Sequence, residues 1–145
     1  MQDRKLYTLL TLAGTLPFIA CAVLPLLGVD SISPLGNLHA VAKSYGLAII
    51  CFLSGVHWGT YLSGRFEGSL NLFVISNAIF LTVWFAFIGA NLAWAIAIQA
   101  IAFLLLLVID YRLREGGTIS AHYFRIRAVA TVIAVVALLI ILLSQ

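Results

Sequence analysis

The chain has 145 residues, of which 63% are hydrophobic and only 9% charged, with a formal net charge of +3. A soluble domain carries about 25% charged residues, so the composition excludes a water-soluble globular protein. We also expect no nucleic-acid partner. Residues 68–109 contain no charged side chain and would form about 63 Å of helix, enough to cross a hydrocarbon core of about 30 Å twice. We therefore predict an all-α integral membrane protein with one domain over residues 1–145.

Five apolar runs predict a bundle of five transmembrane helices, in chain order at residues 6–28, 44–63, 69–88, 92–109 and 126–143. Each run is close to the roughly 20 residues that one crossing needs. A membrane β-barrel would instead show alternating segments of about ten residues, so strands are not expected.

The first run also resembles a signal peptide, because Arg4-Lys5 precedes it and Ala20-Cys21-Ala22 resembles a cleavage site. Its apolar stretch continues to Leu27, which is long enough to span the membrane and favours an uncleaved anchor. Pro17 lies inside this run, and its missing N–H leaves the carbonyl of Ala13 without a helical partner.

The polar connection after residue 28 contains Ser33-Pro34, which is typical of a helix start. Two interpretations are open. Leu35, Leu38 and Ala42 form a short helix on the membrane surface, or the second transmembrane helix begins early.

Basic residues indicate the orientation of the bundle. Seven of the eight lie at the N-terminus, between the second and third helices, or near the connection of the fourth and fifth: Arg4, Lys5, Arg65, Arg112, Arg114, Arg125 and Arg127. Only Lys43 lies on the other side. Because cytoplasmic loops are enriched in Lys and Arg, we predict a cytoplasmic N-terminus and a periplasmic C-terminus in a bacterial inner membrane.

The second predicted helix contains a histidine where membrane helices seldom have one. His57 lies about 10 Å below the cytoplasmic boundary, on a stripe with Ser54, Tyr61 and Arg65, and Trp58 flanks this stripe. Ionisable residues inside spans are candidates for function.

A separate face of the same helix contains Gly55, Gly59 and Ser63. This spacing of small residues allows another helix to approach closely. We therefore predict that the second helix is central, with one packing face and one polar face.

Other polar groups are expected at the depth of His57. Ser76 and Asn77 lie at a similar distance from the cytoplasmic boundary in the third helix, and Thr131 lies one turn inside Arg127 in the fifth. These groups predict either a ligand site or a simpler arrangement in which His57 and Asn77 bond to each other and fix the helix register.

The connection "DYRLREGGTISAHYFRIR" contains four arginines. It is expected to set the topology and contact lipid head groups. A sharper interpretation makes it an anion site at the mouth of the polar cluster, with Arg65 and Arg127 as clamps.

Catalytic chemistry and metal binding are not expected. Cys21 and Cys51 fall inside spans and are interpreted as apolar fillers, and no metal-ligand spacing is present. No carboxylate falls inside a predicted span, which argues against hydrolysis and proton pumping. We predict no enzyme activity and no cofactor.

Three segments resemble a known group of proteins: "GTLPF", "YGLAIICFLSGVHWG" and "YFRIRAVAT". They are similar to an uncharacterised family of small bacterial inner-membrane proteins, with transmembrane protein 69 as a mitochondrial relative. The resemblance covers nearly the whole chain and implies the same topology. It lends weight to Pro17, His57, Trp58, Arg127 and Thr131 but implies no activity.

Three functions fit these observations. The first is a binding or accessory protein that holds a lipid or quinone-like amphiphile in the cytoplasmic leaflet, with its head at His57, Asn77 and Tyr61. The second is a structural or assembly partner in a larger membrane complex, docked through Gly55 and Gly59. The third is a homo-oligomeric channel or transporter. A cavity beside His57 favours the first, an exposed glycine face the second and a symmetric pore the third.

Overall fold

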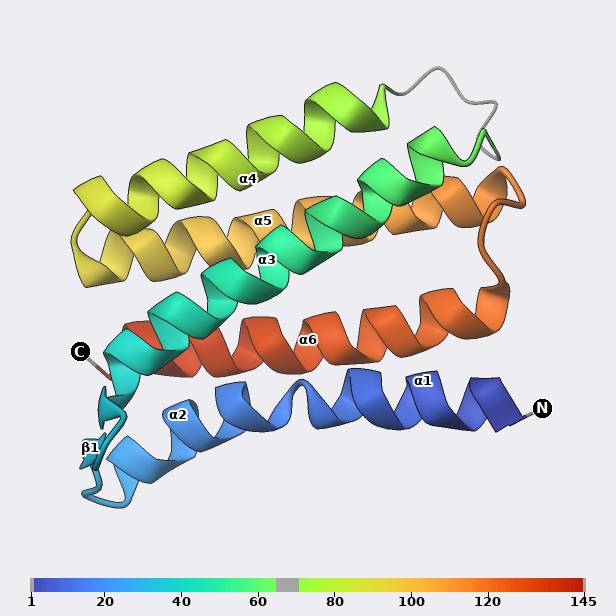
Figure 1. The fold of residues 1–145 in the computed structure, drawn as a ribbon. Coiled ribbons are helices and arrows are strands. Elements are labelled where there is room, and N and C mark those ends of the chain that lie inside the picture. Colours follow the sequence, from blue (N-terminus) through green and yellow to red (C-terminus); the bar gives the residue numbers. More distant parts are fainter. Residues whose placement is uncertain (1, 65–70, 145) are drawn as a thin grey trace.

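The structure is a computed structural model that describes residues 2–64 and 71–144, with residues 2 and 3 described by their backbone alone. It contains six helices and one short hairpin within these residues (Figure 1). They are α1 (Gln2–Ala13), α2 (Leu16–Leu26), β1 (Ser31–Ile32), β2 (Gly36–Asn37), α3 (Leu38–Leu62), α4 (Leu72–Gly89), α5 (Leu92–Glu115) and α6 (Ala121–Leu143).

Within the described residues, five segments are long and apolar enough to cross a membrane: α1 together with α2, and each of α3, α4, α5 and α6. This confirms the predicted all-helical architecture of five candidate spans and indicates a multi-pass membrane protein. The N-terminus and the α5–α6 turn lie at one end of the bundle, and the hairpin and the C-terminus lie at the other (Figure 1).

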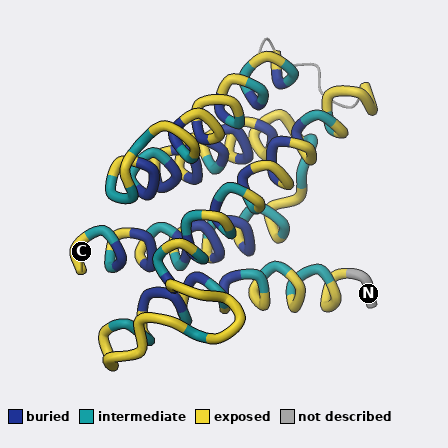
Figure 2. Tube along the Cα trace, turned by 60° about the vertical axis from the view of Figure 1, so that its left-hand side comes forward, coloured by how far each residue is buried: buried dark blue, intermediate teal, exposed yellow. Residues whose placement is uncertain are grey.

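The most buried spans are α5 and α6, which pack against each other, while α3 crosses the bundle and contacts α2, α4 and α5. The expectation that the second predicted helix is central is therefore only partly met. Figure 2 shows the buried residues on the inward side of the helices and the exposed residues on the outside. The ring of Phe18 packs edge-on against Tyr45 and Phe103, which joins α2, α3 and α5.

Polar caps set helix starts that the apolar pattern missed. Asn37 accepts hydrogen bonds from the backbone N–H groups of His39 and Ala40, so α3 begins six residues before the predicted position. The early start is thus confirmed, and the separate surface helix is wrong. A two-residue antiparallel pair, β1 with β2, precedes the cap, although no strand was expected. Ser120 caps α6 in the same way by accepting from the N–H of Tyr123.

The first predicted helix is interrupted between α1 and α2. Pro17 cannot donate a backbone hydrogen bond, and the break spans Gly14 and Thr15. The carbonyl of Gly14 accepts a hydrogen bond of 2.9 Å from the hydroxyl of Tyr45 in α3. The carbonyl at the break that receives a donor from another helix is therefore that of Gly14. The sequence predicts an unpaired carbonyl one residue earlier, at Ala13.

At the hairpin end, Gln99 joins α5 to α3. Its amide donates a hydrogen bond of 2.7 Å to the carbonyl of Lys43, and its side chain is fully buried. The amide lies so close to Gly46 that a Cβ atom at this position would collide with it. A side chain larger than glycine at this position would therefore force the Gln99 amide to shift.

Candidate functional site: a buried His–Asp–Arg cluster

Three helices bring ionisable side chains into contact near the end of the bundle that contains the N-terminus. Nε2 of His57 (α3) lies 2.9 Å from Oδ1 of Asp110 (α5), and Nε of Arg127 (α6) donates to Oδ2 of the same carboxylate at 3.1 Å. Relative exposures are 2% for His57, 3% for Asp110 and 7% for Arg127. A buried ion pair with a histidine on its free oxygen therefore joins three spans.

The charges of this cluster fix how its hydrogens are arranged. Arg127 is protonated at any physiological pH, and a buried positive charge must be paired, so Asp110 is the carboxylate that neutralises it. An ionised carboxylate only accepts hydrogen bonds. His57 therefore donates through Nε2–H to Oδ1 of Asp110.

Two polar atoms beside the ion pair have no partner among the described residues. They are Nδ1 of His57 and Oγ1 of Thr131, and both are buried. Such atoms are costly to leave unpaired, because burial removes their bonds to water. An unpaired buried polar atom therefore calls for an explanation, such as a bound molecule or ordered water.

Cavities adjoin the cluster on two sides. One, of about 150 Å³, lies against the α1–α2 break and is lined by Gly14, Phe18, Phe52, Arg127 and Thr131 among others. The other, of about 320 Å³, is lined by His57, Asp110 and residues of the α5–α6 turn. Tyr123 lines both cavities. The cluster thus borders space on both sides.

The structure brings only part of the predicted site together. His57 and Arg127 share Asp110, and Thr131 lines the smaller cavity beside Arg127. Arg65 lies outside the described residues. The predicted partner Asn77 instead donates to the carbonyl of Phe73 in its own helix, so the proposed His57–Asn77 bond is wrong.

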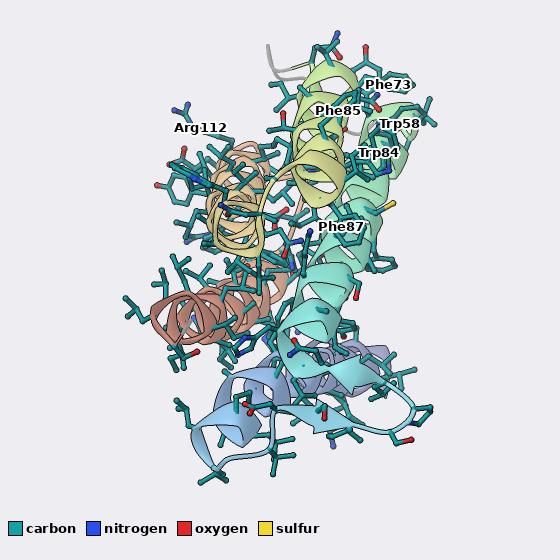
Figure 3. The ribbon with its side chains drawn as sticks, turned by 90° about the vertical axis from the view of Figure 1, so that its left-hand side faces the viewer. Trp58, Phe73, Trp84, Phe85, Phe87 and Arg112 are labelled. Carbon is teal, nitrogen blue, oxygen red and sulfur yellow. The ribbon has the colours of Figure 1, made fainter. Side chains whose placement is uncertain are left out.

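Trp58 and Tyr61 belong to a different part of the molecule. The ring of Trp58 stacks on Phe73 of α4, with centroids 4.0 Å apart, and Tyr61 packs on the same phenylalanine. Figure 3 shows Trp58 beside Phe73. These aromatic residues join α3 to α4 and do not line either cavity at the cluster.

Asp110 is the residue that sequence reasoning missed. The predicted fourth span ended at Ile109 because the next residue is charged, whereas α5 continues to Glu115. The expectation that no carboxylate lies inside a span is therefore wrong. A signal was present, since Phe103, Leu106, Asp110 and Leu113 follow a helical spacing of three and four residues and are all buried.

The glycine face is exposed. Gly55 and Gly59 have no atom within 4 Å of an added Cβ among the described residues, and neither is buried. The expected packing of another helix of this chain on this face is therefore not found. No group of three His, Cys, Asp or Glu side chains that would suit a metal ion occurs in the described part of the chain.

The fold and the cluster define a class: multi-pass membrane proteins in which candidate membrane spans surround a buried ionic cluster. Within this class, the chain belongs to the family described as a protein of unknown function (DUF3429), whose model matches residues 4–143. Comparisons with curated proteins and with solved structures found no match. The family assignment agrees with the uncharacterised family that the sequence resembles, and it covers nearly the whole chain.

Proposed function

We propose that the protein binds an amphiphile inside the membrane, with the head group at His57, Arg127 and Thr131. The observation that supports this proposal best is that cavities border the buried cluster: His57 and Asp110 line the larger one, and Arg127 and Thr131 line the smaller one. A head group in the smaller cavity would lie against Arg127 and Thr131, and one in the larger cavity would lie against His57. Small-molecule sites commonly combine an apolar lining with a few polar groups in this way.

The smaller cavity suits the start of an apolar tail. Most of its lining is apolar, including Leu10, Phe18 and Phe52, and Phe52 is 68% exposed at the outer surface of α3. A tail that passes Phe52 would reach the surrounding lipid directly. The ligand class that fits is therefore a lipid or quinone-like molecule.

We further propose that the cluster lies in the cytoplasmic leaflet of a bacterial inner membrane, with transmembrane protein 69 as a mitochondrial relative. The described basic residues other than Lys43 belong to α1, to the last turn of α5 or to the first turns of α6, and these segments lie at the cluster end of the bundle (Figure 1). The positive-inside rule assigns such an end to the cytoplasm.

The direct test is mass spectrometry of a solvent extract from the purified protein. We expect one class of amphiphile at close to one molecule per chain, well above its fraction in the membrane extract. A lipid profile identical to that of the surrounding membrane would contradict the proposal.

A second function, as a structural partner in a larger membrane complex, is favoured by the exposed face with Gly55 and Gly59. Small residues at this spacing allow close contact with a helix of another chain. Substitution of both glycines by leucine is expected to release such a partner without changing ligand content, which separates the two functions.

A further inference from the structure

We infer that the groove between α1 and α6 is a second binding site, which takes an anionic phospholipid and holds its phosphate head group at Arg4 and Lys5. The groove has a volume of about 530 Å³ and is lined by Arg4, Lys5, Thr8, Leu9, Leu12 and His122. It shares no lining residue with either cavity at the cluster. This site is therefore separate from the proposed amphiphile site beside His57.

The polar end of the groove is positively charged. Arg4 and Lys5 are exposed, and among the side chains that the structure describes neither forms an ion pair and no acidic one lines the groove. His122 adds an N–H donor, because an imidazole ring has at least one whether it is neutral or protonated. Basic pockets between membrane helices bind anionic lipid head groups, so these residues suit a phosphate.

The groove changes from polar to apolar along α1 in the same order as a phospholipid. Lys5, Leu9 and Leu12 are spaced by four and three residues, so they lie on one face of the helix, and about 10 Å of helix separates Lys5 from Leu12. Leu9 is 65% exposed. A head group at Lys5 would therefore place its tails along the two leucines, whereas a soluble anion would use only the polar end.

Aromatic contacts join the two helices that form the groove. The ring of Tyr7 in α1 lies edge-on to His122 of α6, with centroids 5.9 Å apart, and it also packs against Tyr123 at 6.0 Å. Figure 1 shows α1 beside the first turns of α6. The groove is therefore formed by packing within the chain, which lowers the cost of ordering a bound lipid.

The experiment uses two lipids with identical tails, dioleoyl phosphatidylglycerol and dioleoyl phosphatidylcholine. Both contain a phosphate diester, but choline adds a positive charge that makes its head group neutral overall. The detergent-purified full-length protein is stripped of lipid and offered an equimolar mixture, and bound lipid is counted by native mass spectrometry. We expect the wild type to prefer phosphatidylglycerol by at least about tenfold, equal to 1.4 kcal/mol, because two basic residues act on one phosphate.

Matched charge variants locate the site. Arg4→Gln with Lys5→Gln removes two positive charges from the groove and is expected to abolish most of the preference. The control, Arg112→Gln with Arg114→Gln, removes the same charge from the last turn of α5, where neither residue lines the groove. Figure 3 shows Arg112 on the side of α5 that faces away from α1. All four side chains are exposed, so we expect every variant to fold, and the control should keep the wild-type preference.

Inorganic phosphate tests whether the tails matter. An excess of phosphate is expected to displace little phosphatidylglycerol, because it makes no contact with Leu9 and Leu12. Complete displacement would mean that the groove is a site for soluble anions and would overturn the lipid assignment.

The remaining outcomes are also decisive. A wild type without a preference, a groove variant that keeps it, or an equal loss in the control variant overturns the second site. If the double groove variant unfolds, Arg4→Gln and Lys5→Gln are measured singly, and an unchanged preference in both has the same consequence. The groove variant should still retain the amphiphile proposed beside His57, so failure of one site leaves the other standing.

Discussion

Asp110 is the residue on which the buried cluster depends, because it accepts from both His57 and Arg127. An ion pair in a low-dielectric interior is weak evidence of stability in itself, since desolvation offsets much of the attraction. Removing one partner is much more costly than removing both, because a single buried charge then remains unpaired. Comparing single and double variants of Asp110 and Arg127 therefore tests this ion pair.

We expect Asp110→Leu to lower the free energy of unfolding by roughly 3–5 kcal/mol, since it leaves Arg127 buried and unpaired. The double variant Asp110→Leu with Arg127→Met should recover much of this loss. Thermal unfolding in detergent measures both. A single variant as stable as the double variant would show that Arg127 reaches water once Asp110 is removed.

The sequence predicted the residue types of the site better than their contacts. The structure brings His57, Arg127 and Thr131 to one region, but it assigns the partner of His57 to Asp110 and not to Asn77. The amide of Asn77 instead donates to the carbonyl of Phe73 in its own helix. Spacing along the chain does not predict such a local hydrogen bond. A charged residue after an apolar run usually marks the end of a span, so the sequence alone places Asp110 in a loop.

At the scale of elements, the spans were predictable and their ends were not. Apolar runs of sufficient length indicate a membrane helix without any knowledge of its neighbours. The ends depend on single polar caps such as Asn37 and Ser120, and the break between α1 and α2 depends on Pro17 and on the hydroxyl of Tyr45. These are tertiary or local hydrogen bonds that hydropathy does not register.

The contact of α3 with α5 at Gly46 yields a prediction with a matched control. We expect Gly46→Ala to destabilise the protein by about 1–3 kcal/mol, because the new methyl group displaces the amide of Gln99 from the carbonyl of Lys43. Gly59→Ala, on the same helix with open space around it, should cause no loss. Unfolding temperatures of the two variants provide the comparison, and equal values would contradict the close contact.

At the scale of the whole molecule, the five candidate spans place the two termini at opposite ends of the bundle (Figure 1). The cluster lies toward the end with the N-terminus, where most of the described basic residues gather. The proposed orientation therefore predicts which side of the membrane offers access to the site.

Reporter fusions test this orientation. A periplasmic reporter such as alkaline phosphatase, fused after Gln145, is expected to be active, and the same reporter fused after Gly117 in the α5–α6 turn is expected to be inactive. A cytoplasmic reporter at the same two positions should give the reverse pattern. Phosphatase activity at Gly117 alone would contradict the orientation and would move the cluster to the outer leaflet.

The central claim is the proposal that an amphiphile binds in the cavities beside His57 and Thr131. The most direct measurement is the amount of specific amphiphile per chain in the purified wild type and in His57→Ala, with unfolding temperature recorded for both. Tyr61→Phe, which alters a residue packed on Phe73 away from the cavities, serves as the control. We predict that the wild type and the control retain the ligand and that His57→Ala folds but loses at least about nine-tenths of it, a tenfold drop worth 1.4 kcal/mol. Equal and unselective lipid content in all three proteins, with a lower unfolding temperature for His57→Ala, would mean that the cluster serves only to join the helices.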